Sequence, residues 1–367
     1  MNTRDLQRSF FVPVTAMLAG VLALALPLAA GGAQRTFVSS SGQDINACSI
    51  AAPCRSFGTA LAHTDPGGEI TVLDSAGYGA VTIAQSVSII APSGVYAGVS
   101  VFSSFDGVDV NGTGVNVTLR GLSINGQGGN VGIKFQQGAR LAIDGCTVSG
   151  MMGNGISATA ANGAITIADT IARGNGNYGI LVTGTLQASI VRSRAEANAN
   201  AGFAFGDGAS VSVADSTAVN NGMLGVHVLT GIAATTQVTL DRLEARGNSI
   251  GVLANAVVSG ARTVVHVTRA NLSQNPNGGL QACCPSYLGI VTASVTDSLV
   301  ASSDVGIALY APALSWTVTA GGNRVVDNNV YGFLNFGSAG TFNSRFDNTL
   351  AGNGIDTLGT ITALFGQ

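Results

Sequence analysis

A glycine followed by a bulky apolar residue recurs along most of the chain. Ten such pairs begin at positions from Gly132 to Gly354, at nearly regular intervals. Between them, short segments such as residues 141–143 and 238–240 alternate apolar and polar side chains. Alternation with a period of two predicts strands with one buried face. A repeat too short to bury its own apolar face predicts a solenoid of stacked coils.

A turn residue stands two positions after the end of each alternating segment. Another short apolar segment follows the turn, so that each repeat has three such segments. Many of the turn residues are types that tolerate tight or left-handed backbone; the turn positions are Gly121, Gly145, Asp169, Arg192, Asp215, Arg242, Arg269 and Asp297. Three short strands per coil, all running the same way, predict a parallel β-helix.

The asparagine-rich turns that lead into a glycine strand, such as residues 173–180 and 219–226, resemble the right-handed parallel β-helix repeat of the pectate-lyase-like superfamily. The resemblance covers residues from about 69 to 355. It implies an all-β fold, a single-stranded right-handed parallel β-helix with an N-terminal cap. It implies little about chemistry, because proteins of this shape include lyases, hydrolases, epimerases, adhesins and passive stalks.

Residues 34–68 are predicted to form the cap, and they resemble the segment that opens many bacterial β-helix proteins. Residues 36–39 are expected to form a strand and residues 56–62 a short helix that begins after a Ser56 cap. Such a lid covers the strand edges and apolar core of the first coil. The β-helix is expected over residues 69–355, and residues 356–367 form a tail or a second cap.

The N-terminal segment, residues 1–33, is predicted to be a signal peptide. Arg4 and Arg8 precede an apolar run from residue 10 to 28, and Gly31 and Ala33 suit cleavage before Gln34. The alternative is a retained membrane anchor. We expect an exported protein, periplasmic or extracellular, without a membrane span after cleavage.

The cysteines fall into three groups. Cys48 and Cys54 lie six residues apart in the cap of an exported chain, which predicts a disulfide rather than a metal site. Cys146 aligns with apolar and small residues that point inward, so we expect a buried core thiol. The adjacent Cys283 and Cys284 could form a ring, remain free or pair elsewhere, and the sequence leaves these alternatives open.

Charge excludes one class of partner. Without residues 1–33 the chain has 16 − 2 = 14 basic and 19 − 1 = 18 acidic residues, a net charge of −4. The basic residues alternate with acidic ones instead of clustering, so no nucleic-acid surface is expected.

Asp169, Arg192, Asp215 and Arg242 alternate in sign in successive coils, which predicts a structural charge ladder, with a polysaccharide-binding strip as the alternative.

The outward face of the glycine strands is where polysaccharide-active relatives build their sites. Alternation points the following residues outward: Lys134, Ser157, Leu181, Ala204, His227, Leu253, Gln281, Ala308, Leu334 and Asp356. A calcium-dependent lyase needs several carboxylates and a base, and a glycosidase needs two carboxylates. We find only Asp356 on this face, and the catalytic signatures of polygalacturonases and alginate epimerases do not occur in the chain.

The sequence therefore predicts no catalytic residue, no metal and no cofactor. We expect a non-catalytic β-helix protein that binds a polysaccharide or another surface component, with a candidate site of Lys134, Leu181, His227, Leu253 and Gln281. His227 is interpreted as a solvent-facing residue. A polysaccharide lyase or hydrolase with an atypical site, and a structural spacer, remain alternatives. The apolar stripe on this face also allows self-association.

Overall fold

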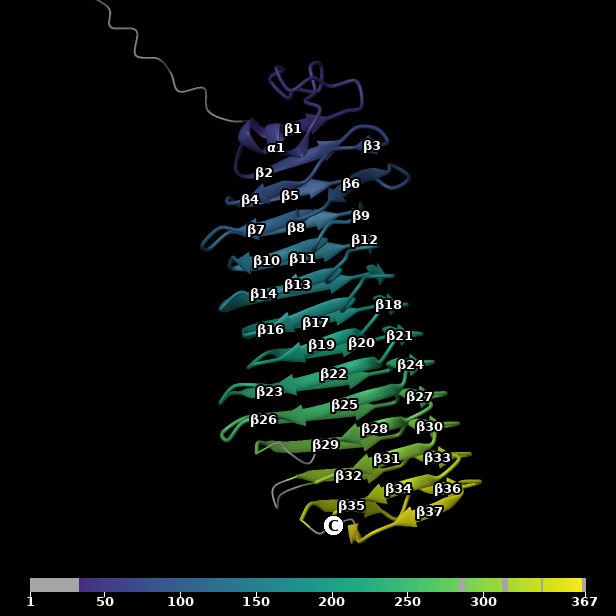
Figure 1. Ribbon diagram of the computed structural model, residues 1–367. Helices are drawn as coiled ribbons and strands as arrows, with labels where there is room; N and C mark the ends of the chain where they lie inside the picture. The colour runs from purple at the N-terminus through teal and green to yellow at the C-terminus, as the bar shows by residue number, and fades with distance from the viewer. Residues whose placement is uncertain (1–32, 284–287, 312–315, 338, 365–367) are drawn as a thin grey trace, which may run out of the picture. The chain divides into compact units, whose positions relative to one another are not determined.

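A computed structural model describes residues 33–283, 288–311, 316–337 and 339–364. The chain winds in coils that stack on one another, and the strands of successive coils form three parallel β-sheets (Figure 1). Every pairing between named strands is parallel. From β2 onward, neighbouring strands of one sheet are three apart in the chain, because each coil contributes one strand to each sheet. This is the predicted parallel β-helix.

The first sheet has 14 strands and carries the alternating segments. In order of pairing it contains β1 (Ala33–Val38), β2 (Thr64–Val72), β5 (Val87–Ile90), β8 (Asn116–Arg120), β11 (Arg140–Asp144), β14 (Asn162–Ala168), β17 (Thr185–Val191), β20 (Ser210–Ala214), β23 (Thr235–Asp241), β26 (Arg262–Thr268), β29 (Ile290–Thr296), β32 (Thr317–Gly321), β35 (Thr341–Arg345) and β38 (Ile361–Leu364).

The second sheet has 12 short strands. These are β3 (Ala76–Gly77), β6 (Ala97–Phe102), β9 (Leu122–Gln127), β12 (Thr147–Ser149), β15 (Ile171–Arg173), β18 (Arg194–Glu196), β21 (Thr217–Val219), β24 (Glu244–Arg246), β27 (Asn271–Ser273), β30 (Leu299–Ala301), β33 (Arg324–Val326) and β36 (Thr349–Ala351).

The third sheet, also of 12 strands, contains the glycine strands. These are β4 (Val81–Ile83), β7 (Val108–Asn111), β10 (Ile133–Gln137), β13 (Ile156–Ala158), β16 (Ile180–Thr183), β19 (Ala201–Gly206), β22 (Leu224–Thr230), β25 (Ile250–Ala256), β28 (Gly278–Ala282), β31 (Val305–Leu309), β34 (Tyr331–Asn335) and β37 (Ile355–Leu358).

The core is built from columns of like residues. On the first sheet, one inward column stacks in register and is almost fully buried: Leu119, Ile143, Ile167, Ile190, Val213 and Leu240. Because every coil repeats the same inward positions, each apolar side chain is covered by its equivalents in the coils before and after it. This is how a repeat that cannot bury its own apolar face becomes stable.

The two tight corners of the coil are fixed by backbone and amide chemistry. All eight predicted turn residues have a positive φ, between 45° and 71°. At the other corner, Asn198, Asn221, Asn248 and Asn275 are buried, and each accepts a hydrogen bond of 2.9–3.1 Å from the backbone N–H of the asparagine one coil earlier. The ladder satisfies polar groups that the tight turn would otherwise bury without partners.

The predicted charge ladder exists as discrete ion pairs. Arg192 contacts Asp169 at 2.7 Å, and Arg242 contacts Asp215 at 2.5 Å, each across one coil. The hydrogen bond from Arg192 lowers the pKa of Asp169. Arg173 lies in register with Glu196 as predicted, but Glu196 pairs with Arg194 on its own strand. The side chains of the Arg192–Asp169 and Arg242–Asp215 pairs are 45–60% exposed, so these pairs mainly keep the coils in register.

The N-terminal cap contains the predicted helix and disulfide. Helix α1 (Phe57–Ala62) begins after Ser56, whose side chain accepts a hydrogen bond from the backbone N–H of Thr59. Cys48 and Cys54 are bonded to each other, with their Cα atoms 4.6 Å apart. The Tyr78 hydroxyl donates to Asp74 at 2.5 Å, and this bond, with others from Ser40 and Ser39, lowers the pKa of Asp74 to about 2.

Some predictions need correction or lie beyond the described residues. The coils do not stop at residue 355, because β37 pairs with β34 and β38 with β35. Cys146 is buried as predicted, and burial raises the pKa of its thiol to about 11. Cys283 is a disulfide cysteine. The predicted signal peptide, residues 1–33, lies outside the described residues except for Ala33, and so do the alternatives for Cys284.

No helix within the described ranges has the length and apolar character needed to cross a bilayer.

Candidate functional site

The outward side of the third sheet, from β4 to β37, is called the glycine-strand face here. The strand register places nine of the ten predicted outward residues in one column, from Lys134 to Leu334. The tenth is wrong: Phe333 pairs with Thr357, so Leu358 rather than Asp356 continues the column. The interval from Gly332 to Gly354 is shorter than those between the earlier glycines, so the alignment of the earlier coils does not hold there.

The five predicted ligand-binding residues all lie in this column but do not form one group. His227, Leu253 and Gln281 occupy adjacent strands. Leu181 is two coils before His227 and is separated from it by Ala204, while Lys134 lies two coils before Leu181. A ligand that contacts all five would have to extend along several coils.

The apolar stripe on this face is less exposed than the sequence suggests. Ala308 is 0% exposed and Leu334 is 3% exposed, although both point away from the core. With Val305 they form a small apolar cluster, separate from the main core, against which Tyr310 and Tyr331 pack. Side chains on the outside of the β-sheet thus bury one another, which alternation along a single strand does not reveal.

At the N-terminal end of the face lies a polar cluster, which we define as Asp106, Asp109, Lys134 and Gln136. The ammonium group of Lys134 lies 2.9 Å from Asp106 Oδ2, and Gln136 Nε2 donates to Asp109 Oδ1 at 2.7 Å. Lys134 and Asp109 are in register on neighbouring strands. A small hollow of about 300 Å³ adjoins the two carboxylates and is also lined by Phe105.

The polar cluster corrects the prediction that Asp356 is the only carboxylate on this face. The signal was present in the sequence, because Gly107-Val108 is another glycine-apolar pair one coil before Gly132. Starting the repeat at Gly132 left Asp109 out of the outward column. Two carboxylates against one ammonium give the cluster a formal charge of −1.

His227 lies in the outward column as predicted, but it is less exposed than a freely solvent-facing residue. Its side chain is half-buried between Ala204 and Leu253 on the neighbouring strands. Burial lowers the pKa of His227, because the charged imidazolium would lose solvation. Its Nε2 lies 3.2 Å from Asn255 Oδ1, and Asn255 in turn donates to the backbone carbonyl of Cys283. No carboxylate takes part in these hydrogen bonds.

Two residues beyond the first outward column runs a second one, formed by Leu229, Asn255, Cys283, Tyr310 and Phe336. Backbone hydrogen bonds continue the stacking past the strand ends: Cys283 donates to Ala254, Tyr310 to Ala282 and Phe336 to Leu309. A hollow of about 330 Å³ opens there, lined by Gln281, Cys283, Tyr310, Ala311, Phe336 and Gly337. We call it the aromatic hollow. Sequence reasoning named Gln281 but missed both aromatic residues, because it followed only one outward column.

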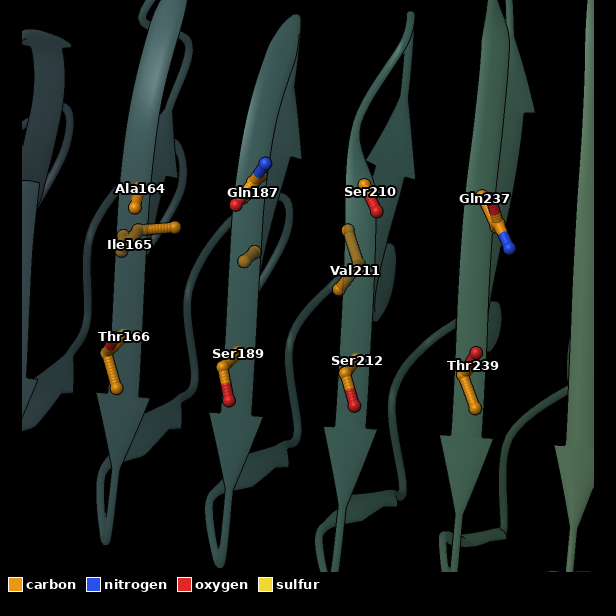
Figure 2. A pocket seen from close by; sticks show the side chains of 11 residues that line it. Ala164, Ile165, Thr166, Gln187, Ser189, Ser210, Val211, Ser212, Gln237 and Thr239 are labelled. Carbon is orange, nitrogen blue, oxygen red and sulfur yellow. The ribbon is translucent and has the colours of Figure 1, made fainter.

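A third hollow, of about 400 Å³, lies on the first sheet. Figure 2 shows two rows of short polar side chains on successive strands, with Gln187, Ser210 and Gln237 in one and Thr166, Ser189, Ser212 and Thr239 in the other. All of these side chains are exposed. The surface offers hydroxyl and amide groups but no charge, aromatic ring or buried polar group with which to fix a ligand.

Comparison with known proteins agrees with this architecture. Residues 68–221 match the family model described as a right handed beta helix region. The chain has the fold of a right-handed parallel β-helix. The resemblance inferred from the repeat is thereby confirmed for the fold. No curated protein matches the chain in sequence.

Three solved structures share the β-helix at low sequence identity. The A-module of mannuronan C-5 epimerase AlgE4 from Azotobacter vinelandii is 16% identical, with a TM-score of 0.60, covering 82% of this chain and 91% of that one. Pectate lyase Pel9A is 15% identical, with a TM-score of 0.53 and coverage of 88% and 80%. XylC, in a complex with xylose, is 8% identical, with a TM-score of 0.59 and coverage of 79% and 75%. These similarities establish the fold alone.

The described part of this β-helix offers one group of metal-ligand residue types, and it is not suited to a metal. Cys48, Cys54 and His63 bring their ligand atoms within 4.8 Å of one another. The two sulfur atoms are bonded to each other, so neither is available as a thiolate. The group belongs to the cap and lies apart from the glycine-strand face.

Proposed function

We propose that this chain is an exported, non-catalytic β-helix protein that binds a carbohydrate or another surface component along its glycine-strand face. The observation that carries the proposal is the aromatic hollow, where the rings of Tyr310 and Phe336 stand beside the amide of Gln281 on three successive coils. Ligand sites usually combine apolar walls with a few polar groups that set orientation. The names of the similar structures, with mannuronan, pectate and xylose, favour a carbohydrate.

The arrangement of the middle of the face supports binding over catalysis. From Ser157 to Leu334 the first outward column carries no carboxylate, and His227 bonds to an amide. A glycosidase needs two carboxylates, and a nucleophile or general base needs an acid or base partner that activates it. Adjacent apolar side chains and amides suit contact with a sugar surface better than bond cleavage.

Binding of the protein comprising residues 34–367 to an array of glycans tests the proposal. A ligand found there should bind more weakly to the Leu253→Asp variant, because a charge replaces an apolar contact in the middle of the face. Ser212→Asp, which adds the same charge to the exposed first sheet, is the matched control, and circular dichroism verifies that both variants fold. An array without any ligand, or a loss confined to Ser212→Asp, contradicts the proposal.

A second candidate function is a polysaccharide lyase or hydrolase with an atypical site. The polar cluster favours it, because Asp106, Asp109 and Lys134 bring two carboxylates and an ammonium group together at one end of the face. Incubation with pectate, alginate and neutral polysaccharides, with and without calcium, tests this candidate. Turnover that disappears in Asp109→Asn or in His227→Ala would replace the binding proposal by the enzymatic one.

A further inference from the structure

The aromatic hollow is formed by three successive coils that each place a different side chain at the same position. Cys283, Tyr310 and Phe336 follow β28, β31 and β34, and the ring centroids of Tyr310 and Phe336 lie 6.2 Å apart with an angle of 55° between the planes. Phe336 is 66% exposed. An exposed phenyl ring beside a second, tilted ring leaves aromatic surface open to a ligand.

The hollow also contains two polar groups that have hydrogen-bonding capacity to spare. Gln281 is only 8% exposed, and its Nε2 donates to the backbone carbonyl of Asn277 at 2.9 Å. Within the described ranges the Oε1 atom of Gln281 has no hydrogen-bond partner. This oxygen is not fully buried, so a ligand can reach it. The hydroxyl group of Tyr310 also lacks a partner there, and burial raises the pKa of Tyr310, which keeps the hydroxyl protonated and able to donate.

Among the described residues that line the aromatic hollow, none is charged. The first outward column carries no charged residue from Ser157 to Leu334. The second continues toward the N-terminus through Gly206 and Thr183 to Thr159, and it carries no charged residue from Thr159 to Phe336. The nearest ammonium on the face is that of Lys134, which is paired with Asp106 in a cluster of net negative charge. A carboxylate ligand would therefore lose solvation in the hollow without gaining a cationic partner.

We infer that the aromatic hollow binds the ring of a neutral sugar and discriminates against uronates. The inference rests on the proposed function and adds the class of ligand. The C–H bonds on one side of a pyranose ring pack against the aromatic surface, while Gln281 Oε1 accepts from one hydroxyl and the Tyr310 hydroxyl bonds to another. A volume of about 330 Å³ lies at the small end of ligand pockets, which suits one sugar ring with its neighbours extending along the face.

Calorimetric titration with neutral and acidic oligosaccharides tests the inference. The probes are xylopentaose and cellopentaose, and pentamers of galacturonate and mannuronate. At least one neutral pentamer should bind, and the uronates should bind more than tenfold more weakly. Phe336→Ala and Tyr310→Ala should each weaken the neutral ligand about five- to tenfold, in the range that one aromatic contact supplies.

Three further variants separate the contributions of ring, hydroxyl and amide. Phe102→Ala removes an equally exposed ring, 61% accessible, from the second sheet and should leave binding unchanged. Tyr310→Phe keeps the ring and should weaken binding only about two- to threefold, whereas Gln281→Leu should cause a larger loss. Thermal unfolding followed by circular dichroism identifies any variant that fails to fold, and Tyr310→Phe then carries the test by itself.

The outcomes distinguish this inference from the proposed function. Neutral binding that is insensitive to Phe336→Ala and Tyr310→Ala overturns the site but leaves carbohydrate binding in place. Uronate binding in preference to neutral sugar overturns the ligand class alone. Binding of neither class overturns the inference, while the glycan array separately decides the proposed function. An apolar dye that occupies the hollow and is not displaced by neutral pentamers identifies a site for an apolar ligand and also overturns the inference.

Discussion

The two ends of the glycine-strand face stabilise their outward side chains in opposite ways. At the N-terminal end, outward side chains are charged and satisfied by one another, as in the pair of Lys134 and Asp106. At the C-terminal end, outward side chains are apolar and bury one another, so that Ala308 is inaccessible although it lies outside the core. The strands pair in parallel at both ends, with one irregularity between Phe135 and Gln137 at the polar end.

The difference shows that the geometry of a coil does not determine the solvation or the chemistry of an outward column. A coil supplies positions at a regular spacing, and the side chains there set the local dielectric and therefore the chemistry. The charged end remains half-solvated, so its ion pair is partly screened. The apolar end excludes water, so an added charge there would be severely destabilising.

Ala308→Asp should have the largest effect on this comparison. It places a carboxylate among Val305, Leu334 and the two tyrosines, without a cationic partner, and should lower the free energy of unfolding by about 3 kcal/mol or more. Ala80→Asp makes the same substitution at an exposed position beside the polar cluster and should change it by less than about 0.5 kcal/mol. Urea unfolding measures both. Similar values would mean that the two ends do not differ in solvation.

The architecture could be predicted from the sequence because every coil repeats the same pattern of apolar, polar and turn residues. Turn residues such as Asp169 and Asp215 could be assigned to their corner since each is followed by the same pattern, and both have the predicted positive φ. The Cys48–Cys54 bond followed from spacing in the cap. These features depend on local backbone conformation and on short separations along the chain.

The candidate site was harder to predict because it depends on neighbours that lie a full coil away along the chain. Lys134 was correctly placed outward, but its partner Asp106 belongs to the preceding coil and lies just before β7 rather than in the column. Tyr310 and Phe336 come together because each directly follows a strand, β31 and β34, in neighbouring coils. Burial of Leu334 likewise arises from side chains of other coils. Alternation gives the direction of a side chain but not what covers it.

Asp106→Asn should have an intermediate effect, at the polar end. The substitution keeps an acceptor for the backbone N–H of Val131 but removes the charge that faces Lys134, whose side chain is 30% exposed. We expect a loss of about 1 kcal/mol at low ionic strength and a smaller loss at high salt.

A double-mutant cycle isolates this pair. Adding Lys134→Gln to Asp106→Asn should cost less than the sum of the two single changes, since each single change already removes the ion pair. Asp109→Asn, which alters a carboxylate bonded to the neutral Gln136, should be milder than Asp106→Asn. Strict additivity in the cycle would show that Lys134 and Asp106 are not coupled.

His227→Gln should have the smallest effect, and only in a limited range of pH. His227 lies between the two ends, and burial holds its pKa below the ordinary value of 6.5. As the pH falls below about 6.5, the unfolded chain therefore takes up a proton before the folded one does, and stability decreases by about 1.4 kcal/mol for each unit by which the folded pKa is lowered. Urea unfolding across this range should show the decrease in the native protein and lose this part of it in His227→Gln. His266→Gln, which removes a histidine from the first sheet, is the control for losing one titratable group. Parallel pH profiles for the native protein and His227→Gln would mean that His227 is as well solvated as the polar end of the face.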